Sequence, residues 1–248
     1  MQHLNTLPFS IEISIKDSVE KFTKELYYSL FDINYANNYI KNIETNFILI
    51  CKKLDINTSE KKWSEFNSKI SSIRKDLMLD AEAALQKDPA AKSLKEIYFA
   101  YPGFLAIAIY RLSHELLILD IPLLPRMMSE FAHSLTGVDI HPGATIGNSF
   151  FIDHATGIVI GETTIINNNV SIYQGVTLGG IQVKKELASV KRHPTIESNV
   201  TIYANATILG GNVVIGENSI IGANVCITKS IPKNSIVTYK TAYNINPL

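Results

Sequence analysis

The sequence has 248 residues, and its 23 basic and 23 acidic side chains give a formal net charge of zero. A chain of this length holds one or two domains, and a hydrophobic content of 46% is sufficient for a large core. The balanced charge argues against a nucleic-acid-binding protein, and the longest apolar stretch, residues 99–109, is too short for a membrane span. Because residues 1–10 also lack a signal-peptide pattern, we expect a cytoplasmic protein with no nucleic-acid or membrane partner.

The two cysteines, Cys51 and Cys226, are far apart in the sequence and share no CxxC spacing. Such cysteines are typical of a reducing compartment, in which thiols remain unpaired. We expect both to be small buried residues, with Cys226 inert on a core strand position.

Apolar residues recur at helical spacing from about residue 15 to residue 135. One apolar stripe consists of Phe22, Leu26, Leu30 and Ile33. Helix boundaries are indicated by a turn over residues 55–60, by Asp88-Pro89, by Pro102-Gly103 and by Pro122. The pattern predicts five to seven helices in an N-terminal domain over residues 1–136.

A period of six residues replaces the helical period after Val138. Thirteen aliphatic residues follow it in three series: Ile140, Ile146 and Ile152; Ile160, Ile166, Ile172 and Leu178; and Ile196, Ile202 and Ile208, then, after one extra residue, Ile215, Ile221 and Ile227. This spacing is typical of a three-sided parallel β-helix, in which one coil takes about 18 residues. We expect left-handed backbone conformations at corners that contain Gly147, Gly161, Asn167, Gly216 and Gly222.

Two longer irregularities interrupt the six-residue period. Ile152 and Ile160 are eight residues apart, with the extra residues within segment 153–157, and the polar segment 181–191 is expected to leave the coil as a loop. Insertions in a solenoid commonly lie on its binding face. The sequence therefore predicts an α+β protein, in which an all-helical domain precedes a parallel β-helix over residues 137–248 with an extruded loop and a short C-terminal tail.

The histidines beside these irregularities are candidates for acid–base chemistry. His154 lies inside the first irregularity, and a histidine oriented by a carboxylate can deprotonate a hydroxyl near neutral pH. Asp153 is adjacent to His154, whereas Asp139 could approach it within one chain or from a neighbouring subunit, or could merely cap a turn. Arg192 has a planar guanidinium that suits a carboxylate, although the Arg192-His193-Pro194 segment could instead anchor the loop.

A zinc site made of His141, His154 and His193 is a second hypothesis, as in the β-helix carbonic anhydrases. Their spacings are 13 residues (141 to 154) and 39 residues (154 to 193), with no closely spaced pair. We therefore predict no metal site, and we expect His141, which precedes Pro142, to be a structural corner residue.

Five motifs resemble those of the serine O-acetyltransferases, which belong to the hexapeptide-repeat acyltransferase superfamily. They are VDIHP at residues 138–142, DHATGIVIGE at 153–162, VTLGG at 176–180, RHP at 192–194 and KDPA at 87–90. The resemblance implies that the β-helix is left-handed. It also implies transfer of acetyl from acetyl-CoA to the hydroxyl of L-serine by direct attack, which gives O-acetyl-L-serine and CoA in the first step of cysteine biosynthesis.

The resemblance further implies a role for each matching residue. His154 would be the general base and Asp139 its carboxylate partner. Asp88 and Asp153 would hold the serine ammonium, and Arg192 with His193 would hold its carboxylate. Gly179, Gly180, Ala204, Gly222 and Ala223 would line the acetyl-CoA site.

The implied partners follow from the same family. We expect a homotrimer with active sites between subunits, or a dimer of trimers joined through helical domains 1–136. L-cysteine is expected as a feedback inhibitor, and cysteine synthase (O-acetylserine sulfhydrylase) as a partner of the tail that ends in Leu248. The alternatives are an acetyltransferase with another hydroxyl acceptor, such as homoserine, a sugar or a xenobiotic, and a non-catalytic regulatory subunit.

Overall fold

A computed structural model describes residues 12–181 and 190–240 of the chain. Most of the predicted loop 181–191 and the tail that ends in Leu248 therefore lie outside the described residues. The chain divides into two compact units, Met1–Glu65 and Phe66–Leu248. The change from helix to strand occurs after Thr136, where we placed the domain boundary, and that boundary stays a prediction.

The described residues form six helices before the first strand, within the predicted range of five to seven. The helices are α1 (Ile15–Phe31), α2 (Ile33–Lys53), α3 (Ser59–Lys87), α4 (Leu94–Ala100), α5 (Pro102–Ile118) and α6 (Leu124–Thr136). Two predicted boundaries are confirmed, because α3 ends immediately before Asp88-Pro89 and Pro102 occupies the first position of α5. The other two are shifted, since α3 begins at Ser59 within the predicted turn 55–60 and α6 begins at Leu124, two residues after Pro122. In the part of the chain that the structure describes, no helix has the length and hydropathy needed to cross a membrane.

The first unit packs α1 against α2 through an aromatic core. The Phe47 ring lies 5.9 Å from the Phe22 ring and 5.4 Å from the Trp63 ring, measured between centroids. Phe22 and the two leucines of the predicted stripe are buried, but Ile33 is 60% exposed. The prediction for Ile33 was wrong because Asp32 ends α1 and caps α2 by accepting a hydrogen bond from Tyr35 N–H at 3.0 Å.

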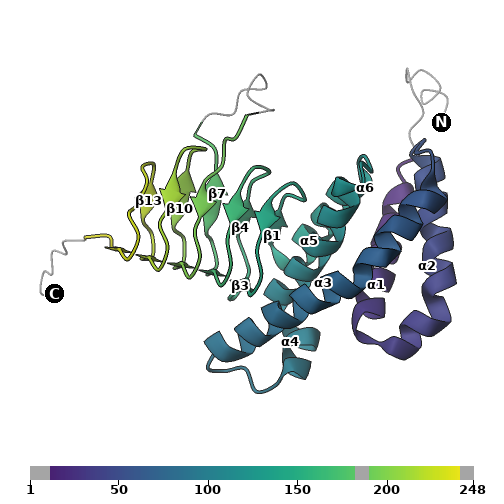
Figure 1. Ribbon diagram of the computed structural model, residues 1–248, viewed down its shortest axis with the longest axis horizontal. Coiled ribbons are helices and arrows are strands. Elements are labelled where there is room, and N and C mark those ends of the chain that lie inside the picture. Colours follow the sequence, from purple (N-terminus) through teal and green to yellow (C-terminus); the bar gives the residue numbers. More distant parts are fainter. Residues whose placement is uncertain (1–11, 182–189, 241–248) are drawn as a thin grey trace, which may run out of the picture. The chain divides into compact units, whose positions relative to one another are not determined.

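In the second unit, the chain after α6 winds into a three-sided parallel β-helix of about five coils (Figure 1). The first sheet contains β1 (Val138–Ile140), β4 (Ile158–Ile160), β7 (Thr177–Gly179), β10 (Thr207–Leu209) and β13 (Cys226–Ile227). The second contains β2 (Thr145–Ile146), β5 (Ile165–Ile166), β8 (Thr195–Ile196) and β11 (Val214–Ile215). The third contains β3 (Phe151–Ile152), β6 (Ser171–Ile172), β9 (Thr201–Ile202), β12 (Ile220–Ile221) and β14 (Ile236–Val237).

The six-residue period produces the core of this β-helix. All thirteen aliphatic residues of the three series are buried, with exposures of 8% or less. Strand register stacks them directly, since Ile140 pairs with Ile160, Ile160 with Leu178, and Leu178 with Ile208. The predicted parallel β-helix is therefore confirmed, and its core is one continuous aliphatic stack.

The corners differ from the prediction in which residue takes the left-handed backbone conformation. None of the five residues named for it has a positive φ among the described residues. At four of those corners the left-handed residue lies two positions later, at Ser149, Asn169, Asn218 and Asn224. Asparagine tolerates this conformation because its short polar side chain can hydrogen-bond locally. The prediction was therefore wrong about which corner residue takes the left-handed conformation.

The cysteines also differ from each other. Cys51 is fully buried, as expected, but Cys226 is exposed. In β13 successive side chains point to opposite faces, and Ile227 takes the inward position, so Cys226 points outward. The expectation that Cys226 is a core residue was therefore wrong.

A buried ion pair within the second unit connects the helices to the first coil. The Arg111 guanidinium donates to both Asp80 oxygens, with Nε 2.6 Å and Nη2 2.9 Å away, and also to the Gly147 carbonyl at 2.8 Å. Asp80 accepts a further hydrogen bond from Phe150 N–H at 2.9 Å. Helices α3 and α5 are thereby joined to the corner between β2 and β3.

Arg111→Met should destabilise the protein by about 3–5 kcal/mol, because it leaves the Asp80 carboxylate buried without its counter-charge. Urea denaturation followed by circular dichroism measures this change. The control is Lys61→Met, which removes an exposed pair with Glu65 and should cost less than about 0.5 kcal/mol. Equal effects of the two variants would contradict the assigned role of Arg111.

Candidate active site

The predicted site residues lie at two different corners of the β-helix. The His154 corner leads from the third sheet to the first and comprises residues 153–157, 173–176, 203–206 and 222–225. The His193 corner leads from the first sheet to the second and comprises residues 141–144, 161–164, 190–194 and 210–213 among those described. In each chain the first sheet separates the two corners.

His154 projects outward because the first coil is longer at this corner. His154 and Ala155 both have left-handed backbone conformations, with φ of 58° and 71°. The methyl group of Ala155 is buried, whereas the His154 side chain is 67% exposed. The two extra residues of the sequence therefore serve to present the imidazole to solvent.

Asp153 is the carboxylate in contact with the His154 ring. The distance from Asp153 Oδ1 to His154 Nδ1 is 3.7 Å. On the next coil the Tyr173 ring lies 6.5 Å from the imidazole, and Tyr203 stacks on Tyr173 with centroids 4.9 Å apart. The corner thus presents one base, one carboxylate and an aromatic pair in a row along the coil axis.

Asp88 joins the same group from the segment between α3 and α4. Its Oδ1 accepts from Ala90 N–H at 2.8 Å, and its Oδ2 accepts from the Tyr101 hydroxyl at 2.5 Å. The negative charges of Asp153 and Asp88 are both among the causes that raise the pKa of Tyr173, after burial. Both carboxylates predicted to bind the ammonium therefore act electrostatically on the same two phenols, those of Tyr101 and Tyr173.

A groove open to solvent lies along the third sheet beside this corner. Its volume is about 240 Å³, and it is lined by side chains that include Lys87, Ser171, Tyr173, Thr201 and Tyr203. Lys87 is half-buried, donates to the Asn169 carbonyl at 3.3 Å, and has its pKa lowered by burial. The groove thus combines hydroxyl groups, an ammonium group and an aromatic surface.

At the His193 corner, His193 is held in a single neutral form. Its Nδ1 accepts from Thr163 N–H at 3.0 Å, so the ring proton of the neutral imidazole is on Nε2. Burial, followed by the charge of Arg192, lowers the pKa of His193 to about 4. The ring packs on Gly161, where an added Cβ would lie 2.2 Å from Nε2, so any larger residue at 161 would displace it. His193 can therefore act near neutral pH as an N–H donor but not as a cation.

Arg192 supplies the positive charge at the His193 corner. Its guanidinium contacts the Glu162 carboxylate, and its backbone N–H donates to Thr163 Oγ1 at 2.9 Å. The same oxygen accepts from His193 N–H at 3.1 Å. Thr163 thus fixes both residues that were predicted to hold the serine carboxylate.

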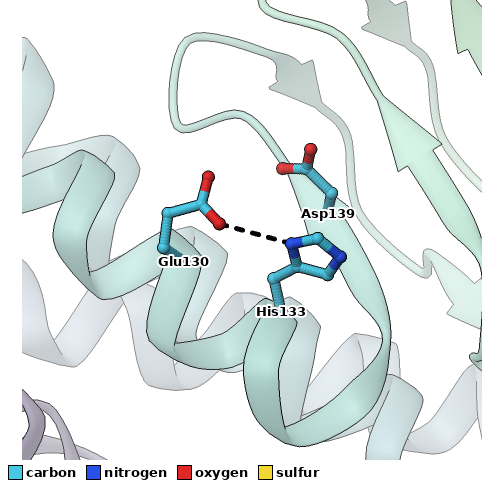
Figure 2. A group of neighbouring side chains, drawn as sticks. All are labelled: Glu130, His133 and Asp139. Atoms are coloured by element: carbon cyan, nitrogen blue, oxygen red, sulfur yellow. Dashed lines mark hydrogen bonds and ion pairs between the residues drawn. The ribbon is translucent and has the colours of Figure 1, made fainter.

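Asp139 points from β1 towards α6 (Figure 2). Its Oδ1 lies 3.3 Å from the Arg126 guanidinium, which also contacts Glu130. Asp139, Glu130 and His133 place possible ligand atoms within 4.8 Å of one another. Because Arg126 already neutralises the carboxylates, this group is an ion-pair network rather than a good cation site. The predicted pairing of Asp139 with His154 stays a prediction.

The three histidines of the zinc hypothesis do not meet within one chain. His141 and His193 belong to the His193 corner, and His154 belongs to the other. His141 Nδ1 accepts from Gly143 N–H at 3.0 Å and stabilises its turn, as expected of a structural corner residue.

Comparison with known proteins agrees with this fold and arrangement. The family model "Bacterial transferase hexapeptide (six repeats)" matches residues 193–229. A serine acetyltransferase of Synechococcus elongatus is 49% identical over 139 residues, which is 54% of this chain and 44% of that protein. The crystal structure of serine acetyltransferase isoform 3 of Entamoeba histolytica, in complex with cysteine, is 36% identical with a TM-score of 0.82, and the match covers 98% of this chain and 88% of that one. The chain belongs to the serine acetyltransferase family.

A further member of the family is similar over most of its length. The serine acetyltransferase of Brucella abortus, solved in complex with coenzyme A, is 29% identical with a TM-score of 0.68, and the match covers 91% of this chain and 80% of that one. By contrast, the chain spans only about half the length of the first curated serine acetyltransferases that it matches, with coverage of 44%, 48% and 50%.

In this serine acetyltransferase family member, the residues predicted for acetyl-CoA are divided between the two corners. Gly179 ends β7 and Gly180 follows it at the beginning of the His193 corner, whereas Ala204, Gly222 and Ala223 lie at the His154 corner. All five are at least partly exposed. Within one chain, the first sheet therefore lies between the two groups.

Sequence reasoning missed Tyr101 and Thr163, which hold the predicted site residues in place. Tyr101 is 13 residues from Asp88, and Thr163 is 30 residues from His193. Neither lies in a motif with an evident chemical role, although Tyr101 precedes a helix-starting proline. Only the folded chain brings each one to its partner.

The pKa of His193 predicts a stability change with pH. The folded protein keeps His193 neutral down to about pH 4, whereas the unfolded chain takes up a proton near pH 6.5. The unfolded state therefore binds more protons below pH 6.5, and the free energy of unfolding should fall by up to about 1.4 kcal/mol per pH unit as the pH decreases towards 4. His193→Gln should flatten this dependence between pH 6.5 and pH 5, measured by urea denaturation. An unchanged slope would show that His193 is not the group responsible.

Proposed function

We propose that this chain transfers the acetyl group of acetyl-CoA to the hydroxyl of L-serine, giving O-acetyl-L-serine and CoA in the first step of cysteine biosynthesis. The observation that carries the proposal is the group at the His154 corner, in which an exposed imidazole lies 3.7 Å from Asp153, while Asp153 and Asp88 both act electrostatically on Tyr173 of the same corner. An amino-acid acceptor needs a base for its hydroxyl and an anionic anchor for its ammonium, and this group supplies both.

The proposed reaction is a direct transfer. His154 removes the hydroxyl proton of serine while the oxygen attacks the thioester carbonyl, so that a C–O bond forms. The tetrahedral species then collapses, the C–S bond breaks, and the imidazolium returns the proton to the leaving thiolate. Asp153, and Asp139 as the resemblance implies, would stabilise the imidazolium between these steps. No covalent intermediate is needed, and neither described cysteine belongs to this corner.

The serine carboxylate needs hydrogen-bond donors, and the predicted donors lie at the His193 corner. Arg192 offers a charged fork and His193 an N–H, which together suit a carboxylate. Within one chain, however, the three-residue strands of the first sheet separate the two corners by about 10 Å, which is more than serine spans. This separation supports a homotrimer in which the His154 corner of one chain meets the His193 corner of its neighbour.

The same arrangement accounts for the two groups of residues predicted for acetyl-CoA. A cleft between neighbouring chains would bring Gly179 and Gly180 of one opposite Ala204, Gly222 and Ala223 of the other. The complex of the Brucella relative with coenzyme A supports this class of ligand. Acetyl-CoA would be consumed as a co-substrate.

L-cysteine shares the ammonium and carboxylate of serine, so the same anchors would bind it as an inhibitor. The complex of the Entamoeba relative with cysteine supports this assignment. A dimer of trimers through the helical domain, binding of cysteine synthase by the tail, and a cytoplasmic location stay predictions from the sequence.

Release of thiol from acetyl-CoA tests the proposal directly, with L-serine, L-homoserine or no acceptor present. We expect release only with L-serine, and His154→Ala should lower the rate roughly 10²–10⁴-fold because the general base is lost. Circular dichroism should show that the variant remains folded. Release with homoserine instead would identify another acceptor, and no release with any acceptor would favour the regulatory-subunit alternative.

A further inference from the structure

Tyr101 occupies a rigid position between α4 and α5. Pro102 follows it, and Tyr101 itself has the extended backbone that a residue before proline adopts, with φ of −88° and ψ of 110°. Its side chain lies in the same packed region as those of Phe104, Phe151 and Ile152. Because β3 ends at Ile152, this packing places Tyr101 directly beside the chain segment that begins with Asp153.

The Tyr101 hydroxyl holds one oxygen of Asp88, and the backbone holds the other. The phenol donates to Oδ2 at 2.5 Å, while Ala90 N–H donates to Oδ1 at 2.8 Å. Each carboxylate oxygen keeps a second lone pair for an outside donor. Burial, the bond to Asp88 and the charges of Asp88, Glu96 and Asp153 raise the pKa of Tyr101, so it stays a protonated donor at neutral pH. The carboxylate therefore has a fixed orientation before any ligand arrives.

We propose that Tyr101 is a positioning residue for the amino-acid substrate, which aims the Asp88 carboxylate at the substrate ammonium. This inference rests on the proposed function, in which Asp88 and Asp153 hold that ammonium. Tyr101 lies within the electrostatic influence of both carboxylates and donates to one of them. It touches neither acetyl-CoA nor the reacting atoms in this account, and it acts only through Asp88.

The same hydrogen bond also closes the segment between α3 and α5, so a purely structural role has to be distinguished. If the hydrogen bond between Tyr101 and Asp88 were only structural, its loss would lower the melting temperature and weaken the binding of both substrates equally. If Tyr101 positions Asp88, loss of its hydroxyl would weaken the binding only of ligands that carry an ammonium group, because neither the binding of acetyl-CoA nor the position of the imidazole depends on Asp88. The distinction therefore lies in which ligand is affected.

Tyr101→Phe removes only the hydroxyl and is the central variant. We expect the KM for L-serine to rise roughly 3- to 10-fold, as for the loss of one hydrogen bond, with kcat and the KM for acetyl-CoA unchanged. The matched control is Tyr110→Phe, which removes a buried phenol that donates to the Ala144 carbonyl at 2.6 Å. That variant should lower the melting temperature and leave the KM for L-serine unchanged.

Two further measurements complete the test. Tyr101→Phe should add nothing to Asp88→Asn in the double variant, because one residue acts through the other. Measured by calorimetry, Tyr101→Phe should weaken the binding of L-serine but not the binding of 3-hydroxypropanoate, which lacks the ammonium group. An unchanged KM for L-serine, additive effects in the double variant, or equal weakening of both ligands would overturn the inference. If the wild-type protein instead shows no release of CoA thiol with L-serine, it is the proposed function that fails.

Discussion

The stacking of one aliphatic side chain per side of the coil is the constraint on which the rest of the second unit depends. Ile140, Ile160, Leu178 and Ile208 follow one another in register, and each buries its side chain against the next. A residue can be inserted only where it does not shift this register, which means at a corner. The segment 153–157, which breaks the six-residue period, therefore leaves the core intact and brings the His154 side chain to the surface.

Corners alone do not make the site, because part of it comes from the helices. Asp88 and Tyr101 lie between α3 and α5, and both helices are fixed to the first coil by the buried pair of Asp80 and Arg111. The ion pair reaches the backbone of the coil at Gly147 and Phe150. It thereby fixes the helices that flank Asp88 and Tyr101 to the first coil of the β-helix. The proposed ammonium site thus depends on a contact that takes no part in the chemistry.

The His154 corner and the His193 corner differ in the exposure of the histidine and in which side chain carries the positive charge. At the His154 corner the imidazole is exposed and lies beside the Asp153 carboxylate. At the His193 corner burial keeps the imidazole neutral, and the positive charge is carried by Arg192. We assigned both Arg192 and His193 to the substrate carboxylate, but only Arg192 contributes charge. The division of roles follows from burial rather than from residue type.

Much of this structure could be predicted from the sequence, because it depends on periodicity. The inward residues of the β-helix, the number of helices and the outward position of His154 all follow from spacing. Spacing could not show which residue of each corner takes the left-handed conformation, or that Cys226 points outward, since both depend on local strand geometry. Nor could it show the contacts of Tyr101 and Thr163, which join segments that only the fold brings together.

The central claim is that one active site needs two chains, and mixed oligomers test it most directly. His154→Ala and Arg192→Ala each damage a different corner, so each homo-oligomer should be nearly inactive at low L-serine concentration. In a randomly mixed trimer, about one quarter of the sites combine two intact corners. Co-expressed and separately tagged chains should therefore recover about a quarter of the wild-type rate of thiol release. A mixture no more active than either variant alone would show that both corners act within one chain, and would contradict the account.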